Sequence, residues 1–243
     1  MQEAPATAWI ARARSIKADT QQVVTAALRS AGARRVLIFG GEGQHLAAGL
    51  RAAGFEGVEW DALASPSCRG RDAEGDDFPG VAAQAGRCGD GGHDAAVLVD
   101  ALRMVPPNAM ETTLTRVLDI LRPGASLLVV EPLPAGSFFR AMRPVGDEGA
   151  IRLQAMAAVE RLITSGRAEL RELQRWDRET RFRGLEDFVA FLLLHDPARA
   201  GAIRDNASAL ARAWRANIQF RGGVAILIQP LICWTLAARR PAE

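Results

Sequence analysis

Short apolar runs alternate along the chain with stretches of helical periodicity. The runs are typical of buried strands, because most of them end at Gly, Asp or Pro. They predict six strands: Arg35–Phe39, Gly57–Asp61, Ala95–Val99, Ser126–Val130, Ala168–Trp176 and Val224–Ala238. Apolar residues at spacings of three and four predict the helices Ala6–Ala31, Leu46–Ala53, Ala109–Leu121, Ala150–Ser165, Leu185–Leu194 and Pro197–Ala216.

Strands that alternate with helices are typical of βαβ units, so we expect an α/β fold with a mostly parallel sheet in a three-layer sandwich. The segment Ala64–Gly92 is rich in Gly, Asp, Ser and Arg. It is interpreted as a long surface loop whose only strand candidate is Val81–Gln84. With no repeat and no clear linker, residues 1–243 are expected to form one domain. Its N-terminal helical segment covers 1–32, and a helical cap over 177–223 precedes the last strand.

Composition narrows the class of protein. The 243 residues are 49% hydrophobic and 24% charged, with a net charge of +2, which is typical of a soluble globular chain. No basic face interleaved with aromatic residues is visible, so nucleic-acid binding is not expected. The three histidines have no Asp or Glu spacing that predicts a metal site.

The cysteines and the ends of the chain bear on location. Cys68, Cys88 and Cys233 are far apart and form no C-x-x-C motif, which favours reduced thiols over a disulfide framework or a zinc site. The start of the chain lacks the features of a signal peptide. The longest apolar run contains Gln229 and Pro230 and is too short for a transmembrane segment. A cytoplasmic protein is therefore expected.

The segment Val36–Leu46 is a strand, a Gly-rich turn and the start of a helix. Glycine lets the backbone approach a ligand closely, and the first turn of a helix offers unpaired N–H groups. In open α/β sheets, ligands bind beyond the carboxyl ends of the strands. The pattern is not G-x-G-x-x-G, so it does not predict a dinucleotide site. A tight turn that needs glycine for its own geometry is the alternative.

Asp61 ends the second predicted strand, 23 residues after Ile38. An acid at about 20 residues past a Gly-rich turn is placed to accept hydrogen bonds from ribose hydroxyls. A helix N-cap is an equally good interpretation of Asp61 alone.

One block of the chain resembles the class I S-adenosylmethionine-dependent methyltransferases. It covers His93–Val105 and Leu114–Pro132, with Leu121-Arg122-Pro123-Gly124-Ala125 and Val129-Val130-Glu131-Pro132 as its most specific stretches. In that family a strand begins with an aromatic-Asp pair, and the next helix ends in L-x-P-G-G before the following strand. The order of elements from residue 30 to residue 238 is also similar to the family's seven-stranded Rossmann-like sheet, whose last strand is antiparallel.

The resemblance implies S-adenosylmethionine as the cofactor. It places these residues at the ligand: Gly40, Gly41 and Gly43 in the turn, Asp61 at the ribose, and Asp100 and Leu102 after the fourth strand of the family. The first motif is degenerate. The family's acid position holds Ile38, and its later glycine positions hold Glu42 and Gln44.

The resemblance also implies methyl transfer to an acceptor, for which a small and partly apolar molecule is expected. Residues able to line the acceptor site are Arg103, Met104, Phe138, Phe139 and Met142. His195 is the candidate catalytic base, because imidazole exchanges a proton near neutral pH. A helix-end histidine without a chemical role is the alternative.

The degenerate first motif keeps a second function open. A methyltransferase-like protein without methylation activity would serve as a binding or scaffolding subunit, or would use the cofactor for other chemistry. The sequence leaves a homodimer open as well.

Overall fold

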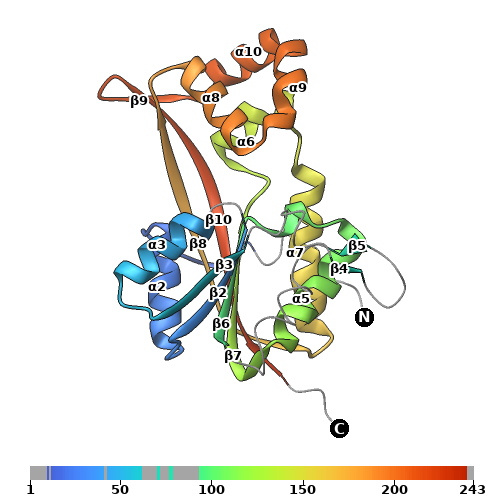
Figure 1. The fold of residues 1–243 in the computed structure, drawn as a ribbon. Coiled ribbons are helices and arrows are strands. Elements are labelled where there is room, and N and C mark those ends of the chain that lie inside the picture. The colour runs from blue at the N-terminus through green and yellow to red at the C-terminus, as the bar shows by residue number, and fades with distance from the viewer. Residues whose placement is uncertain are drawn as a thin grey trace.

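The computed structural model describes residues 10, 12–40, 43–61, 70–71, 77–78 and 93–239. These residues build one mixed sheet with the strand order β1-β8-β10-β7-β6-β2-β3, and β9 pairs with β10 as an eighth strand (Figure 1). The strands are β1 (Arg14–Ser15), β2 (Arg35–Phe39), β3 (Gly57–Asp61), β6 (His93–Val99), β7 (Leu121–Pro132), β8 (Ala168–Phe182), β9 (Gln219–Arg221) and β10 (Val224–Ala238). A separate hairpin pairs β4 (Gly70–Arg71) with β5 (Asp77–Phe78).

The sheet confirms the predicted fold class. Strands β3, β2, β6 and β7 pair in parallel, as do β1 and β8. The last strand, β10, is antiparallel to both β7 and β8. The strand candidate Val81–Gln84 lies outside the described residues.

Helices cover both faces of the sheet and complete three layers (Figure 1). On one face lie α2 (Thr20–Ser30) and α3 (Gly43–Ala52), and on the other lie α5 (Met110–Asp119) and α7 (Gly149–Thr164). Alternate residues of each strand face opposite sides. Ile38 therefore packs with Leu28 and Leu50 on the first face, and Leu37 packs with Leu114 and Val159 on the second. Among the described residues, no helix is long and apolar enough to cross a membrane.

The first predicted helix starts later than expected. We predicted Ala6–Ala31, but α2 begins at Thr20, and the residues before it include β1, which pairs with β8. The Asp19 carboxylate accepts a hydrogen bond from the Gln22 N–H at 2.7 Å, and the Gln22 side chain accepts one from the Asp19 N–H at 3.1 Å. This capping box fixes the start of the helix. Residues 6–9 and 11 lie outside the described part of the chain.

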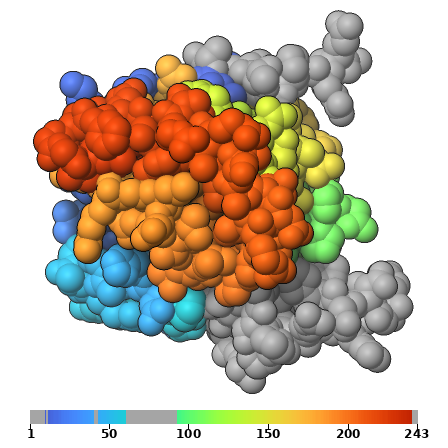
Figure 2. Space-filling view, turned by 90° about the horizontal axis from the view of Figure 1, so that it is seen from above, coloured from blue at the N-terminus to red at the C-terminus, as the bar shows by residue number. Residues whose placement is uncertain are grey.

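A cap sits beyond one end of the sheet, carried by the outer halves of β8 and β10 (Figure 1). It comprises α6 (Gly136–Met142), α8 (Leu185–His195), α9 (Ala200–Asp205) and α10 (Ala207–Asn217), and it has a hydrophobic core of its own. Seen from above, its orange and red residues border the blue and cyan ones of α2 and α3 (Figure 2). The described residues also form four short 3-10 helices: η2 (Leu102–Met104), η3 (Pro107–Ala109), η4 (Arg143–Val145) and η5 (Pro197–Arg199).

Three element predictions around the cap need correction. The strand expected to end at Trp176 continues to Phe182, where it pairs with Ala225 of β10. The helix predicted over Pro197–Ala216 is divided into η5, α9 and α10, with Asn206 between the last two. Helix α6 was not predicted, because seven residues are too few for a periodic pattern to be visible.

Candidate functional site

The carboxyl ends of β2, β3 and β6 meet at one edge of the sheet. Phe39 of β2 pairs with Asp61 of β3 and with Leu98 of β6. The residues that follow these strands therefore share that edge, which is where open α/β sheets bind ligands. Two of the predicted cofactor residues, Gly40 and Asp100, come directly after such a strand, and Asp61 is the last residue of its strand.

The turn after β2 is thin and closely packed. Gly40 has a φ of +115°, and a Cβ atom there would lie 2.1 Å from the Val99 carbonyl oxygen. The Gly43 N–H donates to the Gly40 carbonyl at 3.0 Å, and a Cβ at Gly43 would lie 2.3 Å from the Trp60 ring. Trp60 Nε1 also donates to the Gly40 carbonyl, at 2.9 Å. Both glycines are thus required by the packing of the turn itself.

The structure describes two of the predicted cofactor residues in part or not at all. Gly41 lies outside the described residues, and for Asp61 only its backbone position at the end of β3 is described. Ile38, at the position where the family that the sequence resembles carries an acid, is fully buried in the core. The strand therefore presents an aliphatic side chain, packed against the helices, where the family presents a carboxylate.

The loop after β6 contains a strained residue, Asp100, whose side chain forms an ion pair with Arg103. Asp100 has a φ of +48°, a left-handed conformation that is uncommon for residues other than glycine. Its carboxylate accepts a hydrogen bond from Arg103 Nε at 2.9 Å. Leu102, backbone included, is fully buried: its N–H donates to Glu131 and its carbonyl accepts from the Val105 N–H, so the structure does not place it at a ligand surface. Met104 is 46% exposed.

Glu131 at the end of β7 supports that loop from below. Its Oε1 accepts hydrogen bonds from the backbone N–H groups of Ala101 and Leu102, at 3.2 and 3.0 Å, and its Oε2 is buried without a hydrogen-bond partner among the described residues. Burial and the nearby charge of Asp100 raise the pKa of Glu131 to about 8, although the two N–H groups act in the opposite direction. In the sequence, Glu131 stands out only as part of the stretch that resembles the methyltransferases, and no role was predicted for it.

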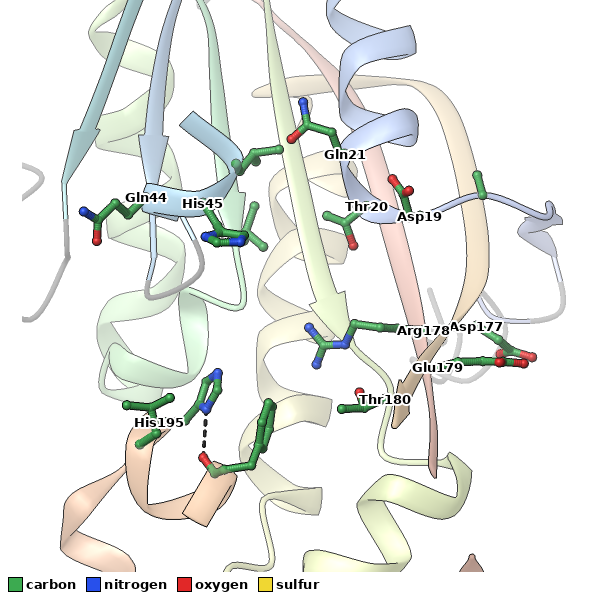
Figure 3. A pocket seen from close by; sticks show the side chains of 15 residues that line it. Asp19, Thr20, Gln21, Gln44, His45, Asp177, Arg178, Glu179, Thr180 and His195 are labelled. Carbon is green, nitrogen blue, oxygen red and sulfur yellow. Dashed lines mark hydrogen bonds between the residues drawn. The ribbon is translucent and has the colours of Figure 1, made fainter. Parts of the chain in front are cut away.

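A cavity of about 870 Å³ opens beside this edge, between the sheet and the cap (Figure 3). Its wall comes from the first residues of α2 and α3, from the end of β6, from the outer part of β8 and from α8. Arg178 of β8 extends into it, whereas Asp177 and Glu179, on the opposite face of the strand, point away (Figure 3). Apolar side chains also line it: Leu46, Val99, Phe191 and Leu194. Its volume suits a small-molecule ligand.

His195, the predicted base, lies on the rim of this cavity and also lines a smaller one of about 50 Å³. Its Nδ1 lies 2.9 Å from the Phe191 carbonyl oxygen, and its ring lies 4.1 Å from the Phe191 ring, centroid to centroid. A carbonyl oxygen can only accept a hydrogen bond, so Nδ1 is assigned the proton, and Nε2 of the neutral ring is the acceptor. His45, at the start of α3, faces the same cavity (Figure 3).

Four of the five predicted acceptor residues lie at the smaller cavity or in the core of the cap, and the exposed Met104 lies at neither. Phe138, Met142 and Arg103 line the smaller cavity. Phe139 is buried in the cap core, with the Arg152 guanidinium 5.0 Å from its ring centre. None of the five predicted acceptor residues lines the larger cavity. Its wall of β8 and α2 was not predicted, because the outer half of β8 was assigned to the cap and Thr20 to the middle of a helix.

Comparisons with known proteins bear on the fold. Neither a family model nor a curated protein matches the chain. Among solved structures, the YcgJ protein from Bacillus subtilis is 13% identical with a TM-score of 0.50, over 91% of this chain and 98% of that one. A proposed methyltransferase from Bacillus halodurans is 14% identical with a TM-score of 0.47, over 90% and 100%. The O-methyltransferase TomG from Streptomyces achromogenes, solved in complex with S-adenosylmethionine, is 13% identical with a TM-score of 0.39, over 93% and 82%.

At these identities the similarity concerns the fold alone. Together with the strand order and the antiparallel β10, it defines the chain as an α/β protein with a Rossmann-like fold similar to that of YcgJ.

Proposed function

We propose that the protein transfers a methyl group from S-adenosylmethionine to a small, partly apolar acceptor. The observation that carries the proposal is the meeting of Gly40, Asp61 and Asp100 at one sheet edge, next to a cavity of about 870 Å³ beneath the cap. A fold shared with methyltransferase structures supports it.

The residues present fit the cofactor at most positions. Gly40 and Gly43 carry no side chain, so neither of these two residues projects one into the ligand edge. Glu42, which lies between them in the sequence, is outside the described residues. Asp61 would hold the ribose, and Asp100 would line the ligand, with the buried Leu102 fixing the loop behind it. S-adenosylmethionine, when bound, supplies a methyl group on a sulfonium sulfur for in-line displacement by the acceptor.

The chain's own contribution would be positioning, water exclusion and proton removal. Held near-attack geometry can supply about 7–11 kcal/mol of a barrier. The apolar part of the cavity wall, with Val99 from the sheet and Phe191 and Leu194 from the cap, suits an apolar acceptor surface. Nε2 of His195 would take the proton of an acceptor hydroxyl or amine at the rim.

One observation supports a second candidate function. Ile38 is buried in the core where the family that the sequence resembles carries an acid, which removes a polar contact to the methionine end of the cofactor. A methyltransferase-like protein that binds without methylating would fit this change.

Calorimetry with S-adenosylmethionine and S-adenosylhomocysteine tests the proposal, followed by transfer assays with radiolabelled cofactor on phenols, amines and carboxylic acids. Binding of both ligands with label transfer to an acceptor is the expected result. Binding without transfer to any of these acceptors favours the second function, and no binding of either ligand contradicts both uses of the cofactor.

A further inference from the structure

The Glu148 carboxylate, at the start of α7, meets arginine side chains from three parts of the fold. Arg152 Nη2, from its own helix, donates to it at 2.8 Å. Arg199 Nη2, from the cap, donates to its other oxygen. Arg103 Nη1, from the loop after β6, lies 3.7 Å away. The side chains of Glu148 and Arg199 are only 14% and 11% exposed, so these contacts are largely shielded from solvent.

Two of these arginines also contact residues of the candidate site. Arg103 also donates to Asp100, at 2.9 Å, in the loop that carries the predicted cofactor residues. Arg199 also donates to Asp196, at 3.0 Å, and Asp196 follows His195 directly. Glu148 is therefore the shared member of two arms. One reaches the cofactor side of the site, and the other reaches the candidate base.

The charges in this group balance. Three carboxylates, from Asp100, Glu148 and Asp196, face three guanidinium groups, from Arg103, Arg152 and Arg199. Burial acts to raise the pKa of Glu148, but the three arginines outweigh it and hold that pKa below its ordinary value. Neutralising Glu148 would leave three guanidiniums without their common partner in a shielded place, which is strongly unfavourable.

The third arginine does not depend on Glu148 for its place. Arg152 Nη1 donates to the Leu133 carbonyl and to the Gln229 side chain, both at 3.0 Å, so β7 and β10 also hold it. The contacts that bridge separate elements through Glu148 are those to Arg103 and Arg199. Loss of the carboxylate should therefore affect the loop and the cap more than α7.

We propose that Glu148 is a positioning residue that couples the cap to the loop carrying Asp100 and Leu102. In this way the acceptor side and the cofactor side of the site keep one relative placement. The coupling rests on the proposed function for its purpose, because it concerns the two ligands of that reaction.

Hydrogen exchange measured by mass spectrometry, with and without S-adenosylhomocysteine, tests the coupling in the full chain. In the wild type, the ligand should slow exchange both in residues 100–104 and in α8. In Glu148→Gln it should still protect residues 100–104, whereas protection of α8 should fall about tenfold or more. Glu111→Gln makes the same change of charge in the exposed pair with Arg161, at 2.9 Å, and should behave as the wild type.

Retention of α8 protection in Glu148→Gln would overturn the proposal. If that variant does not fold, Arg199→Met removes the cap arm alone and should give the same loss of α8 protection with residues 100–104 still protected.

Failure of the ligand to bind the wild type would contradict the proposed function but not the coupling, because the ligand-free exchange rates still test it. Without ligand, Glu148→Gln should accelerate exchange in α8 and in residues 100–104 together. Acceleration in only one of them, or in neither, would overturn the coupling.

Discussion

Glu131 accepts a hydrogen bond of 3.0 Å from the backbone N–H of Leu102, so that the end of one strand holds the loop that follows the neighbouring strand. Because both groups are buried, the bond forms in surroundings where an unmade hydrogen bond is costly. The shape of the predicted cofactor loop thus depends on a buried carboxyl group of the neighbouring strand.

Glu131→Gln should remove a pH dependence of stability. The pKa of Glu131 is raised from 4.5 to about 8 in the folded protein. The folded state keeps a proton that the unfolded chain releases, so the stability it contributes is complete below pH 4.5 and is lost as the pH rises towards about 8. The loss approaches about 1.4 kcal/mol per pH unit. Urea unfolding at several pH values should show the wild type losing more stability across this window than the variant. Parallel curves would contradict the assignment.

Gly40→Ala should destabilise the protein more than Gly54→Ala. Both glycines have positive φ values, +115° and +90°, so both alanines would pay about 1–2 kcal/mol for a left-handed conformation. Only at Gly40 does the new Cβ also meet a backbone atom, 2.1 Å away, whereas nothing lies within 4 Å at Gly54. A further loss of about 1–3 kcal/mol is therefore expected at Gly40. Equal unfolding free energies for the two variants would show that the turn at Gly40 accommodates the added Cβ without further loss of stability.

Strands with continuous apolar runs were predicted well, because burial on both faces leaves a clear pattern. Arg35–Phe39 and Val224–Ala238 were predicted with the bounds that the structure shows. Gly57–Asp61 was predicted equally well, although it is an edge strand whose exposed Glu59 interrupts the apolar run. The apolar pattern is missing in the outer part of β8, because Asp177, Arg178 and Glu179 follow one another at the edge of a cavity. These three polar residues are typical of a connection, so the strand was predicted to end before them. The early start predicted for α2 was avoidable, since Asp19 and Gln22 have the spacing of a capping box.

Asp61→Ala should weaken the binding of S-adenosylhomocysteine by about 1–3 kcal/mol, the usual loss when hydrogen bonds to a charged acceptor are removed. The expectation rests on the place of Asp61 at the end of β3, beside Phe39 and the turn. Calorimetry measures the change, and Glu56→Ala, before the start of the same strand, serves as the matched control. An unchanged dissociation constant in the Asp61 variant would show that this acid does not hold the ribose.

His195→Ala should reduce turnover about 10²–10⁴-fold if its Nε2 removes the acceptor proton. The pH profile of turnover should also change, because the variant lacks the proton-accepting ring. His45→Ala changes the other histidine of the same cavity wall and should retain the wild-type pH profile. Full rate and an unchanged pH profile in the His195 variant would show that His195 has no chemical role and only packs on Phe191 at the end of α8.

The candidate site was less predictable than the fold, because its contacts join distant parts of the sequence. Glu148 and Arg199 are 51 positions apart, and Ala101 and Glu131 are 30 apart. Neither pair lies within a repeating pattern that a periodicity argument could detect. The Gly-rich turn, by contrast, was found from local sequence, since a strand, a glycine turn and a helix follow one another within a few residues.

The two long strands β8 and β10 have a consequence for how this architecture can vary. The chain leaves β8 after Phe182 and enters β10 at Val224, and the next residue, Ala225, is the pairing partner of Phe182. The segment between the two strands therefore begins and ends at neighbouring points of the sheet. Residues 183–218, which precede β9, can change in length or composition without shifting the pairing of β8 with β10. Under the proposed function, acceptor preference is thus free to diverge while the ligand edge of the sheet stays unchanged.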